Sequence, residues 1–393
     1  MARRTGPRTT GRVSEAARGP AVAGLTRGGG PRFDRTLHGR DSARMAVTYR
    51  RAGVDIAAGD RVAAAARALA RSTLRPEVVA GVGGFGALFR IPRGYRRPLI
   101  VTSTDGVGTK LRIAFMLNRH DTVGIDLVAM NVNDILTLGA EPVAFLDYFA
   151  SGKLRPGVTA QVLTGIAAGC RQAGCSLIGG ETAELPSFYA PGEYDLAGFT
   201  VGVVEEAAVV DGRRITPGDV LIGLPSTGLH SNGYSLARHI CFDMAGLSLR
   251  ARPPELAEPL GAALLRPTQI YVRTVRALPR GALKGMAHIT GGGIMGNLPR
   301  VLPKGCAARV HLGTWPVPGI FTLLHRLGDV QRDEMFRTFN MGIGFVLVVG
   351  TPDASRVLAA LRRRRQPAYV IGEVTRARRG ATPSVTLSGT VPR

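Results

Sequence analysis

The sequence predicts a mixed α/β protein built from two domains, and three observations support this fold class. The chain has 393 residues, which is too long for one ordinary hydrophobic core and fits two domains of average size. Hydrophobic residues make up 45% of it, so a sizeable core can be buried. From Met45 onward, strand-like and helix-like segments alternate, as is typical of mixed α/β folds.

The first 44 residues form the first segment of the chain. They are rich in Arg, Gly and Pro and show no apolar periodicity, which predicts a disordered leader over residues 1–44. A second methionine, Met45, follows at once. Two explanations stay open: either Met45 is the true start and the leader is an inert addition, or the leader is an Arg-rich organelle-targeting segment.

The expected N-terminal domain covers residues 45–215. It opens with a helix over residues 61–73, which has Ala and Leu on one face. This helix ends before Pro76, because a residue that precedes proline disfavours the helical conformation. A Gly-rich segment comes next, and the following stretches then alternate between strand-like and helix-like patterns: 98–104, 121–139, 141–150, 159–174, 175–184 and 194–206.

A turn at residues 215–219 opens the expected C-terminal domain, residues 216–381. Its segments are a strand and loop, a loop and helix, a Gly-rich stretch, a helix, a strand, a helix that holds an RRRR run, and a closing strand; they lie at 219–228, 230–244, 288–303, 321–327, 342–350, around 362–365, and at 367–375. The last residues, 382–393, are expected to be a frayed tail.

Composition excludes some classes of function. The net charge of +23 is typical of a nucleic-acid-binding protein. However, no aromatic residues interleave with the RRRR run, as a base-stacking surface would need. We therefore expect no nucleic-acid partner. No apolar run is long enough to span a bilayer, so no membrane partner is expected either. The four cysteines lack metal-ligand spacing and are expected to be buried thiols in a reducing cytoplasm.

Acidic and amide side chains gather at Gly-rich junctions. Asp105 follows a strand-like run, and Asn131 and Asp134 are three residues apart, which places them on one helix face. Glu181 and Glu184 lie in the stretch GGETAE, also three apart. Carboxylates from separate elements that converge at such turns suit Mg²⁺, which takes oxygen ligands and usually bridges to phosphates.

Three loops carry the phosphate-binding and catalytic signals. The stretch GVGGFG, residues 81–86, lets backbone amides approach an anion, although it lacks the strand before and the helix after that a dinucleotide fingerprint requires. TGGGIMGN, residues 290–297, precedes a helical turn that could seat a phosphate. In STGLHSNGYS, residues 226–235, His230 is expected to have little packing to do and to reach a ligand. Lys110, in TDGVGTK, is one of only four lysines in the chain.

Together these stretches resemble the phosphoribosylformylglycinamidine cyclo-ligase (aminoimidazole ribonucleotide synthetase) family. The matching stretches run in the family's order from about residue 47 to 375: TYRRAGVDI, RPEVVAGVGGFGALF, TDGVGTKLR, GIDLVAMNVNDILTLGAEPVAFLDYFA, IGGETAELP, LHSNGYSLAR, HITGGGIMGNLPRVLP and FNMGIGF. The leader has no counterpart in the family's pattern. A second departure is Arg71, which stands where the family carries lysine before the threonine.

The resemblance implies an ATP-dependent ligase of purine biosynthesis that closes the ring of formylglycinamidine ribonucleotide. It implies ATP and Mg²⁺ as cofactors, a cytoplasmic homodimer that pairs through the N-terminal sheets, and a two-domain fold of the aminoimidazole ribonucleotide synthetase type. Asp105 and Asp134 would hold the metal, Lys110 would offset charge on the transferred phosphoryl group, and His230 would polarise the amide or move a proton. The residues that would bind the nucleotide are Gly81, Gly83, Gly84, Phe85, Gly86, Asn131, Glu181, Asn232, Gly291 and Gly292.

Two alternatives remain beside this reading. One is another ATP-dependent enzyme of the same superfamily. Selenophosphate synthetases usually carry a reactive Cys or selenocysteine in the N-terminal glycine loop, whereas this chain has no Cys before Cys170. The other is a basic nucleic-acid-binding protein, which would be retained on polyanions and show no turnover.

Overall fold

A computed structural model describes residues 47–390 of the chain. Contacts group the chain from Val47 onward into one compact unit. The disordered leader predicted over residues 1–44 lies outside the described residues.

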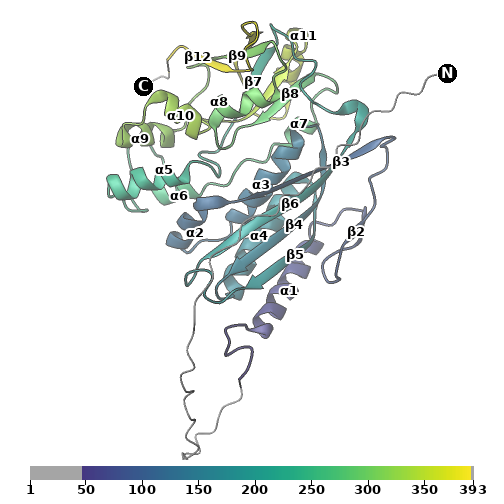
Figure 1. The fold of residues 1–393 in the computed structure, drawn as a ribbon, viewed down its shortest axis with the longest axis vertical. Helices are drawn as coiled ribbons and strands as arrows, with labels where there is room; N and C mark the ends of the chain where they lie inside the picture. Colours follow the sequence, from purple (N-terminus) through teal and green to yellow (C-terminus); the bar gives the residue numbers. More distant parts are fainter. Residues whose placement is uncertain (1–46, 391–393) are drawn as a thin grey trace, which may run out of the picture. The chain divides into compact units, whose positions relative to one another are not determined.

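The first half of the described chain is organised around a four-stranded sheet in the order β3-β6-β4-β5 (Figure 1). Strand β6 pairs antiparallel with both β3 and β4, whereas β4 and β5 are parallel. A parallel pair needs a long crossover, and here helix α4 provides it. The bounds are β3 Pro98–Gly106, β4 Glu141–Ser151, α4 Pro156–Ala173, β5 Ser176–Glu184 and β6 Tyr194–Glu205.

Helices cover one face of this sheet, and α3 and α4 pack closely against each other (Figure 1). Two glycines allow the close approach. A Cβ at Gly124 would lie 2.3 Å from the backbone of Val162, and one at Gly165 would lie 2.5 Å from the carbonyl oxygen of Asp121. Helix α3 is therefore almost wholly buried, which fixes the polar side chains that it carries. Besides α4, the α-helices of this half are α1 Ile56–Arg71, α2 Leu111–Leu117 and α3 Val123–Leu136.

A short hairpin, β1 (Val78–Ala80) and β2 (Leu88–Phe89), packs on part of the other face of the sheet. Its side chains Val78 and Phe89 join a small apolar cluster around Val203. The Gly-rich stretch 81–86 connects the two strands. The sequence prediction that no strand precedes this stretch is therefore wrong: a three-residue strand does, and the stretch is a hairpin loop.

A six-stranded sheet organises the second half, in the order β12-β9-β11-β7-β10-β8. Its strands are β7 Val220–Pro225, β8 Leu283–His288, β9 Cys306–His311, β10 Ile343–Val349, β11 Tyr369–Arg376 and β12 Val385–Ser388. Strand β10 is buried along its whole length, as expected for a continuous apolar run inside a sheet. The α-helices of this second half are α5 Tyr234–Arg238, α6 Leu260–Leu265, α7 Val272–Arg276, α8 Gly293–Asn297, α9 Gly319–Gly328, α10 Arg332–Thr338 and α11 Thr351–Arg363.

The two sheets and their helices confirm the mixed α/β fold class. The predicted boundary near residue 215 falls between β6 and β7, where one sheet gives way to the other. The frayed tail predicted over 382–393 is wrong for residues 385–388, because β12 pairs in parallel with β9 and buries Val385. All four cysteines are free and buried, as predicted. None of the helices between residues 47 and 390 has the length and apolar character to cross a membrane.

Candidate functional site

Asp105 and Asp134 reach the same place from two elements. Asp105 lies near the end of β3, and Asp134 lies near the C-terminal end of α3. Burial raises the pKa of Asp105, and repulsion from the Asp134 carboxylate raises it further, against a hydrogen bond from the Gly106 amide and the attraction of His288. The structure therefore brings together the two acids that the sequence suggests as metal ligands.

His288 belongs to the same group, although the sequence patterns do not single it out. Its Nδ1 lies 2.9 Å from Asp134 Oδ1, and its side chain is only 2% exposed. Its Nε2 is buried and has no partner in residues 47–390. A hydrogen bond from Nδ1–H to Asp134 fixes the tautomer in which Nε2 is a proton acceptor. The available signal was its position: a histidine at the end of a strand, directly before a Gly-rich loop.

Asn131 lies one turn before Asp134 on α3. Its Nδ2 donates to the carbonyl oxygens of Leu127, at 2.9 Å, and Asp105, at 3.3 Å, and its Oδ1 is buried without a partner in the described chain. A Cβ at Gly198 would lie 2.7 Å from this Nδ2, so glycine is required there. Asn131 therefore ties α3 to the end of β3 beside the two acids.

Lys110 is completely buried. Its Nζ donates to Asp126 Oδ1 at 2.8 Å and to the carbonyl oxygens of His230, at 3.0 Å, and Arg266, at 2.5 Å. Burial lowers the pKa of Lys110, and the nearby Asp126 carboxylate partly offsets this. All three ammonium hydrogens have protein acceptors, so the geometry disagrees with a direct contact to a phosphoryl group and indicates a positioning role.

Asp126 completes this buried pair. Its Oδ1 also accepts from the amide of Thr268 at 2.7 Å, from the Thr268 hydroxyl at 2.6 Å and from the Ser231 hydroxyl at 3.3 Å. An ion pair removed from water holds together only when further hydrogen bonds satisfy it. Lys110 and Asp126 thus anchor two loops of the second half of the chain, 226–232 and 266–269, against helix α3.

His230 lies on one of these anchored loops, and it is buried rather than open to solvent. It is 1% exposed, has a positive φ of 62°, and packs beside the ring of Tyr271. Its Nε2 accepts from the amides of Thr227, at 3.1 Å, and Gln269, at 3.4 Å, while its Nδ1 has no partner in the described part of the chain. The expectation that His230 has little packing to do is therefore wrong.

The charge state of His230 follows from this environment. Burial lowers its pKa well below the usual value, and repulsion from His288 and Lys110 lowers it further. The side chain is thus neutral at pH 7, with Nδ1 protonated because Nε2 accepts two hydrogen bonds. This arrangement leaves the Nδ1–H donor without a partner in the described part of the chain and makes a proton shuttle near neutrality unfavourable.

The remaining predicted residues divide into two groups. Asn232 and Gly291 are neighbours, since a Cβ at Gly291 would lie 3.3 Å from Asn232 Oδ1. Gly292 has a φ of 95° and caps α8. The loop residues Gly81, Gly83, Gly84, Phe85 and Gly86 lie apart in the hairpin between β1 and β2, with the Phe85 side chain fully exposed.

Glu181 and Glu184 do not converge with Asp105. Asp105, Gly198, Asp147 and Gly180 form one cross-strand row, so they point to one face of the sheet. Glu181, the next residue along β5, therefore points to the other face. Glu184 accepts from the amides of Asp55 and Leu154 and holds these segments together.

The donors present fit a hard cation only in part. Within residues 47–390, no group of three or more His, Cys, Asp or Glu side chains is arranged to hold a metal ion. The Asp134 carboxylate nevertheless repels that of Asp105, and a divalent cation would relieve this repulsion. Two carboxylates fit Mg²⁺ in the way that this ion usually binds, with substrate phosphates and water as its other ligands.

Comparison with solved structures supports the fold. Thiamine-monophosphate kinase from Stenotrophomonas maltophilia superposes with a TM-score of 0.60 at 20% identity, over 85% of this chain and 96% of that one. A hydrogenase maturation protein HypE in complex with ATP gives a TM-score of 0.58 at 17% identity, over 81% of this chain and 89% of that one. At these identities the likeness shows the shared fold.

Sequence comparison is far closer. Residues 85–204 match the family model "AIR synthase related protein, N-terminal domain", and residues 216–382 match the corresponding C-terminal domain. The phosphoribosylformylglycinamidine cyclo-ligase of Myxococcus xanthus is 58% identical over 340 residues, which is 86% of this chain and 99% of the relative. That of Trichlorobacter lovleyi is 55% identical over 343 residues, 87% of this chain and 98% of the relative. The chain belongs to the AIR synthase family, among the phosphoribosylformylglycinamidine cyclo-ligases.

Proposed function

We infer that this chain catalyses the ATP-dependent cyclisation of formylglycinamidine ribonucleotide to aminoimidazole ribonucleotide in purine biosynthesis, with release of ADP and phosphate. The observation that carries this function is the identity of more than half of the aligned residues to relatives of that name along almost their whole length. The acids and histidines gathered around α3 and β8 agree with it.

The reaction sets the tasks of the site. The oxygen of the formyl amide is a poor leaving group, so transfer of the γ-phosphoryl group of ATP to that oxygen activates the carbon. The amidine nitrogen then attacks this carbon and loses a proton, the C–O bond breaks, and phosphate departs as the ring closes. Such transfers depend on positioning and on cations that offset developing negative charge.

Asp105 and Asp134 are the residues that would hold Mg²⁺. When bound there, the ion would neutralise charge on the phosphates of the nucleotide. Asn131 fixes the distance between α3 and β3, and therefore the separation of the two carboxylates.

The two histidines take different parts. His288 is oriented by Asp134 and offers Nε2 as the acceptor of the proton that the attacking nitrogen loses. His230 is neutral and offers Nδ1–H to the amide oxygen, so it polarises the amide and does not shuttle a proton. Lys110 acts through Asp126 and the backbone of His230, as a positioning residue.

The nucleotide would lie against the glycine loops. The exposed hairpin loop with Phe85 is free to fold over a bound nucleotide, while Asn232, Gly291 and Gly292 form a polar corner beside α8. Glu181 is proposed to bind the nucleotide only from the face of the sheet opposite to the one that carries Asp105. Cytoplasmic localisation remains part of the proposal, and the four free thiols support it.

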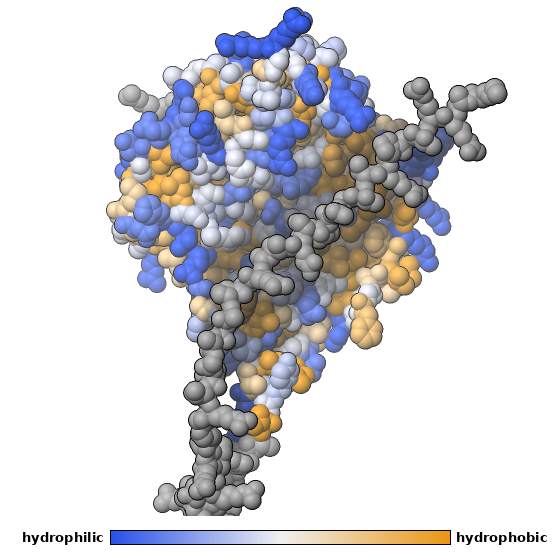
Figure 2. Space-filling model, in the orientation of Figure 1, coloured by the Kyte–Doolittle hydropathy of each residue, from blue (hydrophilic) through white to orange (hydrophobic). Residues whose placement is uncertain are grey.

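The open part of the four-stranded sheet supports the homodimer. Ile100 is 52% exposed and Phe199 is 44% exposed, and both point away from the helices. Figure 2 shows hydrophobic residues gathered over the part of the molecule that holds this sheet. A second copy of the chain, packed sheet against sheet, would cover them.

The test follows ADP release and aminoimidazole ribonucleotide formation by the purified chain with formylglycinamidine ribonucleotide, ATP and Mg²⁺. Asp105→Asn and Asp134→Asn should each lower turnover by roughly 100-fold, about 2.7 kcal/mol of transition-state stabilisation. His288→Ala should do the same through loss of the proton acceptor. His230→Gln should keep more activity than His230→Ala, because an amide N–H replaces the Nδ1 donor.

Asp329→Asn is the matched control, since Asp329 is an exposed carboxylate at the end of α9, and it should have normal turnover. A wild-type chain that releases no ADP with this substrate would overturn the proposed reaction. Normal turnover in either Asp→Asn variant would remove that acid from the metal site.

A further inference from the structure

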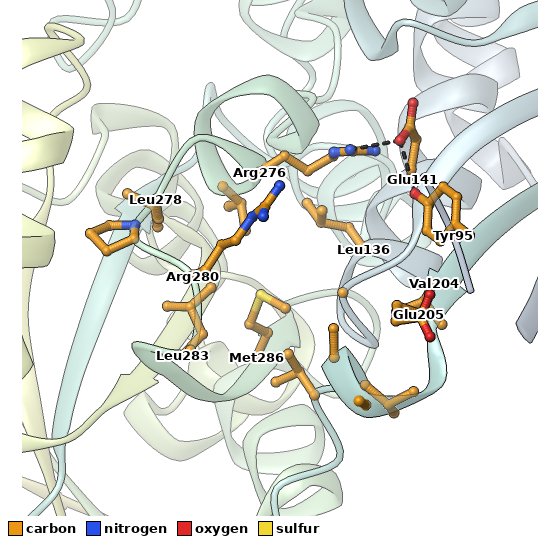
Figure 3. Close-up of a pocket in the computed structure, with 18 of the residues that line it drawn as sticks. Tyr95, Leu136, Glu141, Val204, Glu205, Arg276, Leu278, Arg280, Leu283 and Met286 are labelled. Carbon is orange, nitrogen blue, oxygen red and sulfur yellow. Dashed lines mark hydrogen bonds and ion pairs between the residues drawn. The ribbon is translucent and has the colours of Figure 1, made fainter. Parts of the chain in front are cut away.

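A cavity of about 780 Å³ lies between the two halves of the chain, and its lining includes Leu136 of α3 and Met286 of β8 (Figure 3). Its lining comes from the ends of α3, β4 and β6 on one side and from the segment between α7 and β8 on the other. Sites for small molecules usually have volumes of 300–1,000 Å³, and this cavity is within that range. Nothing in the proposed reaction uses it.

The floor of the cavity is apolar. It is formed by Leu136, Val204, Leu278, Leu283 and Met286, which are all buried (Figure 3). Apolar side chains that line an open cavity favour a ligand with an apolar or aromatic body, because such a body removes both surfaces from water.

Charged residues surround this floor, and most of them already have partners. Arg276 pairs with Glu141 at 2.7 Å, and Glu141 also binds Arg75 at 2.8 Å. Glu205 accepts from two backbone amides, and Arg214 donates to two backbone carbonyls. Both acids and two of the four lining arginines are therefore occupied by protein groups.

Arg93 and Arg280 are the remaining charged residues of the lining. Neither has a side-chain partner among residues 47–390, and both are exposed to solvent at the cavity. Figure 3 shows the Arg280 guanidinium directed into the cavity, toward Arg276. These two lining arginines, without partners in residues 47–390, leave a local positive charge at the cavity that a ligand can neutralise. Guanidinium groups match phosphate oxygens through paired hydrogen bonds.

We propose that this cavity binds a phosphomonoester on an aromatic body, the class to which nucleoside monophosphates belong, with Arg93 and Arg280 on the phosphate and the body on the Leu136–Met286 floor. The site differs from the catalytic one, since neither Asp105 nor His288 lines it.

The cavity is coupled to the catalytic pair through two elements. Helix α3 carries Asp134 and ends at Leu136 in the lining. Strand β8 carries Met286 in the lining and His288 two residues later, on the same face of the strand. A ligand that shifts the end of α3 or the middle of β8 therefore changes the Asp134–His288 contact, and occupancy should alter turnover.

Binding is measured by isothermal titration calorimetry on the full chain, with inosine 5′-monophosphate, inosine and inorganic phosphate as probes. The nucleotide should bind saturably, and at least tenfold more tightly than either fragment, because the fragments each lack one half of the recognition. Binding of all three with equal strength, or of none, would overturn the proposal.

Variants locate the site. The double variant Arg93→Ala/Arg280→Ala should weaken nucleotide binding at least tenfold, and so should Ala208→Trp, which fills the cavity from an exposed lining position. Arg378→Ala, at an exposed arginine outside the lining, is the matched control and should bind as the wild type does. His288→Ala should also retain binding. Loss of binding in His288→Ala with full binding in the double variant would place the nucleotide in the catalytic site and refute the cavity.

Turnover gives the second readout. The bound nucleotide should change the turnover of the wild type at least twofold and leave that of the double variant unchanged. An equal effect on both would show that the nucleotide acts elsewhere.

Discussion

Asp147 shows how burial of a single carboxyl group changes its pKa and the stability of this chain. It lies on β4 in the same cross-strand row as Asp105, and its carboxylate lies over Gly180, where a Cβ would be 2.4 Å from Oδ1. Burial raises its pKa to about 7. An unfolded chain ionises Asp near pH 4, so the folded state holds a proton that the unfolded state has lost between pH 4 and 7. Stability therefore falls as pH rises through this window.

Asp147→Asn should consequently stabilise the protein at pH 8, by an amount on the order of a few kcal/mol, because a shift of about three pH units is involved. The gain should shrink steadily as pH falls from 7 and vanish near pH 4. Urea denaturation at pH 8, 6 and 4.5 checks this. Asp195→Asn, at an exposed carboxylate on β6, is the control. A gain that does not depend on pH would show that Asp147 is not the titrating group.

At the scale of secondary-structure elements, β12 shows how a short strand protects a sheet. It is the edge partner of β9, and the amides of Ala308 and Leu312 donate to the carbonyls of Ser384 and Ser388. Without β12, the backbone groups of β9 would be an unpaired edge available to another chain.

Removing residues 384–393 should therefore lower stability by about 2–3 kcal/mol, through the lost burial of Val385 and the lost hydrogen bonds. It should also increase aggregation. Thermal denaturation followed with light scattering measures both. A chain that lacks only residues 391–393 should behave as the full chain does. Unchanged melting in the longer truncation would mean that β12 contributes little.

The long periodic segments were predictable from sequence, whereas β12 was not. Helix α3 and strand β10 have strong local patterns, and tertiary packing agrees with them. VTLS in β12 is four residues long, follows a proline and glycine region, and pairs with a strand about 77 residues earlier in the chain. Pairing over such a separation leaves no local signal, so the tail was expected to fray.

At the scale of the whole molecule, contacts between distant segments also limit how much of the candidate site the sequence predicts. The sequence predicts functional roles for Asp105, Asp134 and His230 because strand ends and Gly-rich loops commonly carry functional groups. It does not reveal that Lys110 meets the carbonyls of His230 and Arg266, which lie 120 and 156 residues later in the chain. For this reason the sequence predicts a phosphate contact for Lys110, whereas the structure shows it as a buried anchor.

The association of two copies is the prediction that belongs to this scale. The wild type should sediment as a dimer, at twice the 41.5 kDa chain mass. Phe199→Asp should shift it to monomer by placing a charge in the sheet-to-sheet contact. Val370→Asp, at a similarly exposed apolar residue on β11, should remain dimeric. A monomeric wild type, or a dimer that survives Phe199→Asp, would contradict the proposed face.

Lys110 has a consequence for covalent chemistry. In a chain that uses arginine at nearly every basic position, this lysine is enclosed by three acceptors that suit a compact ammonium better than a planar guanidinium. An amine-reactive reagent should acylate the exposed Lys153 and Lys304 while Lys110 stays untouched. Acylation at Lys110 requires loops 226–232 and 266–269 to part from α3, so the mass of the peptide that contains it records how often the two halves of the enzyme separate.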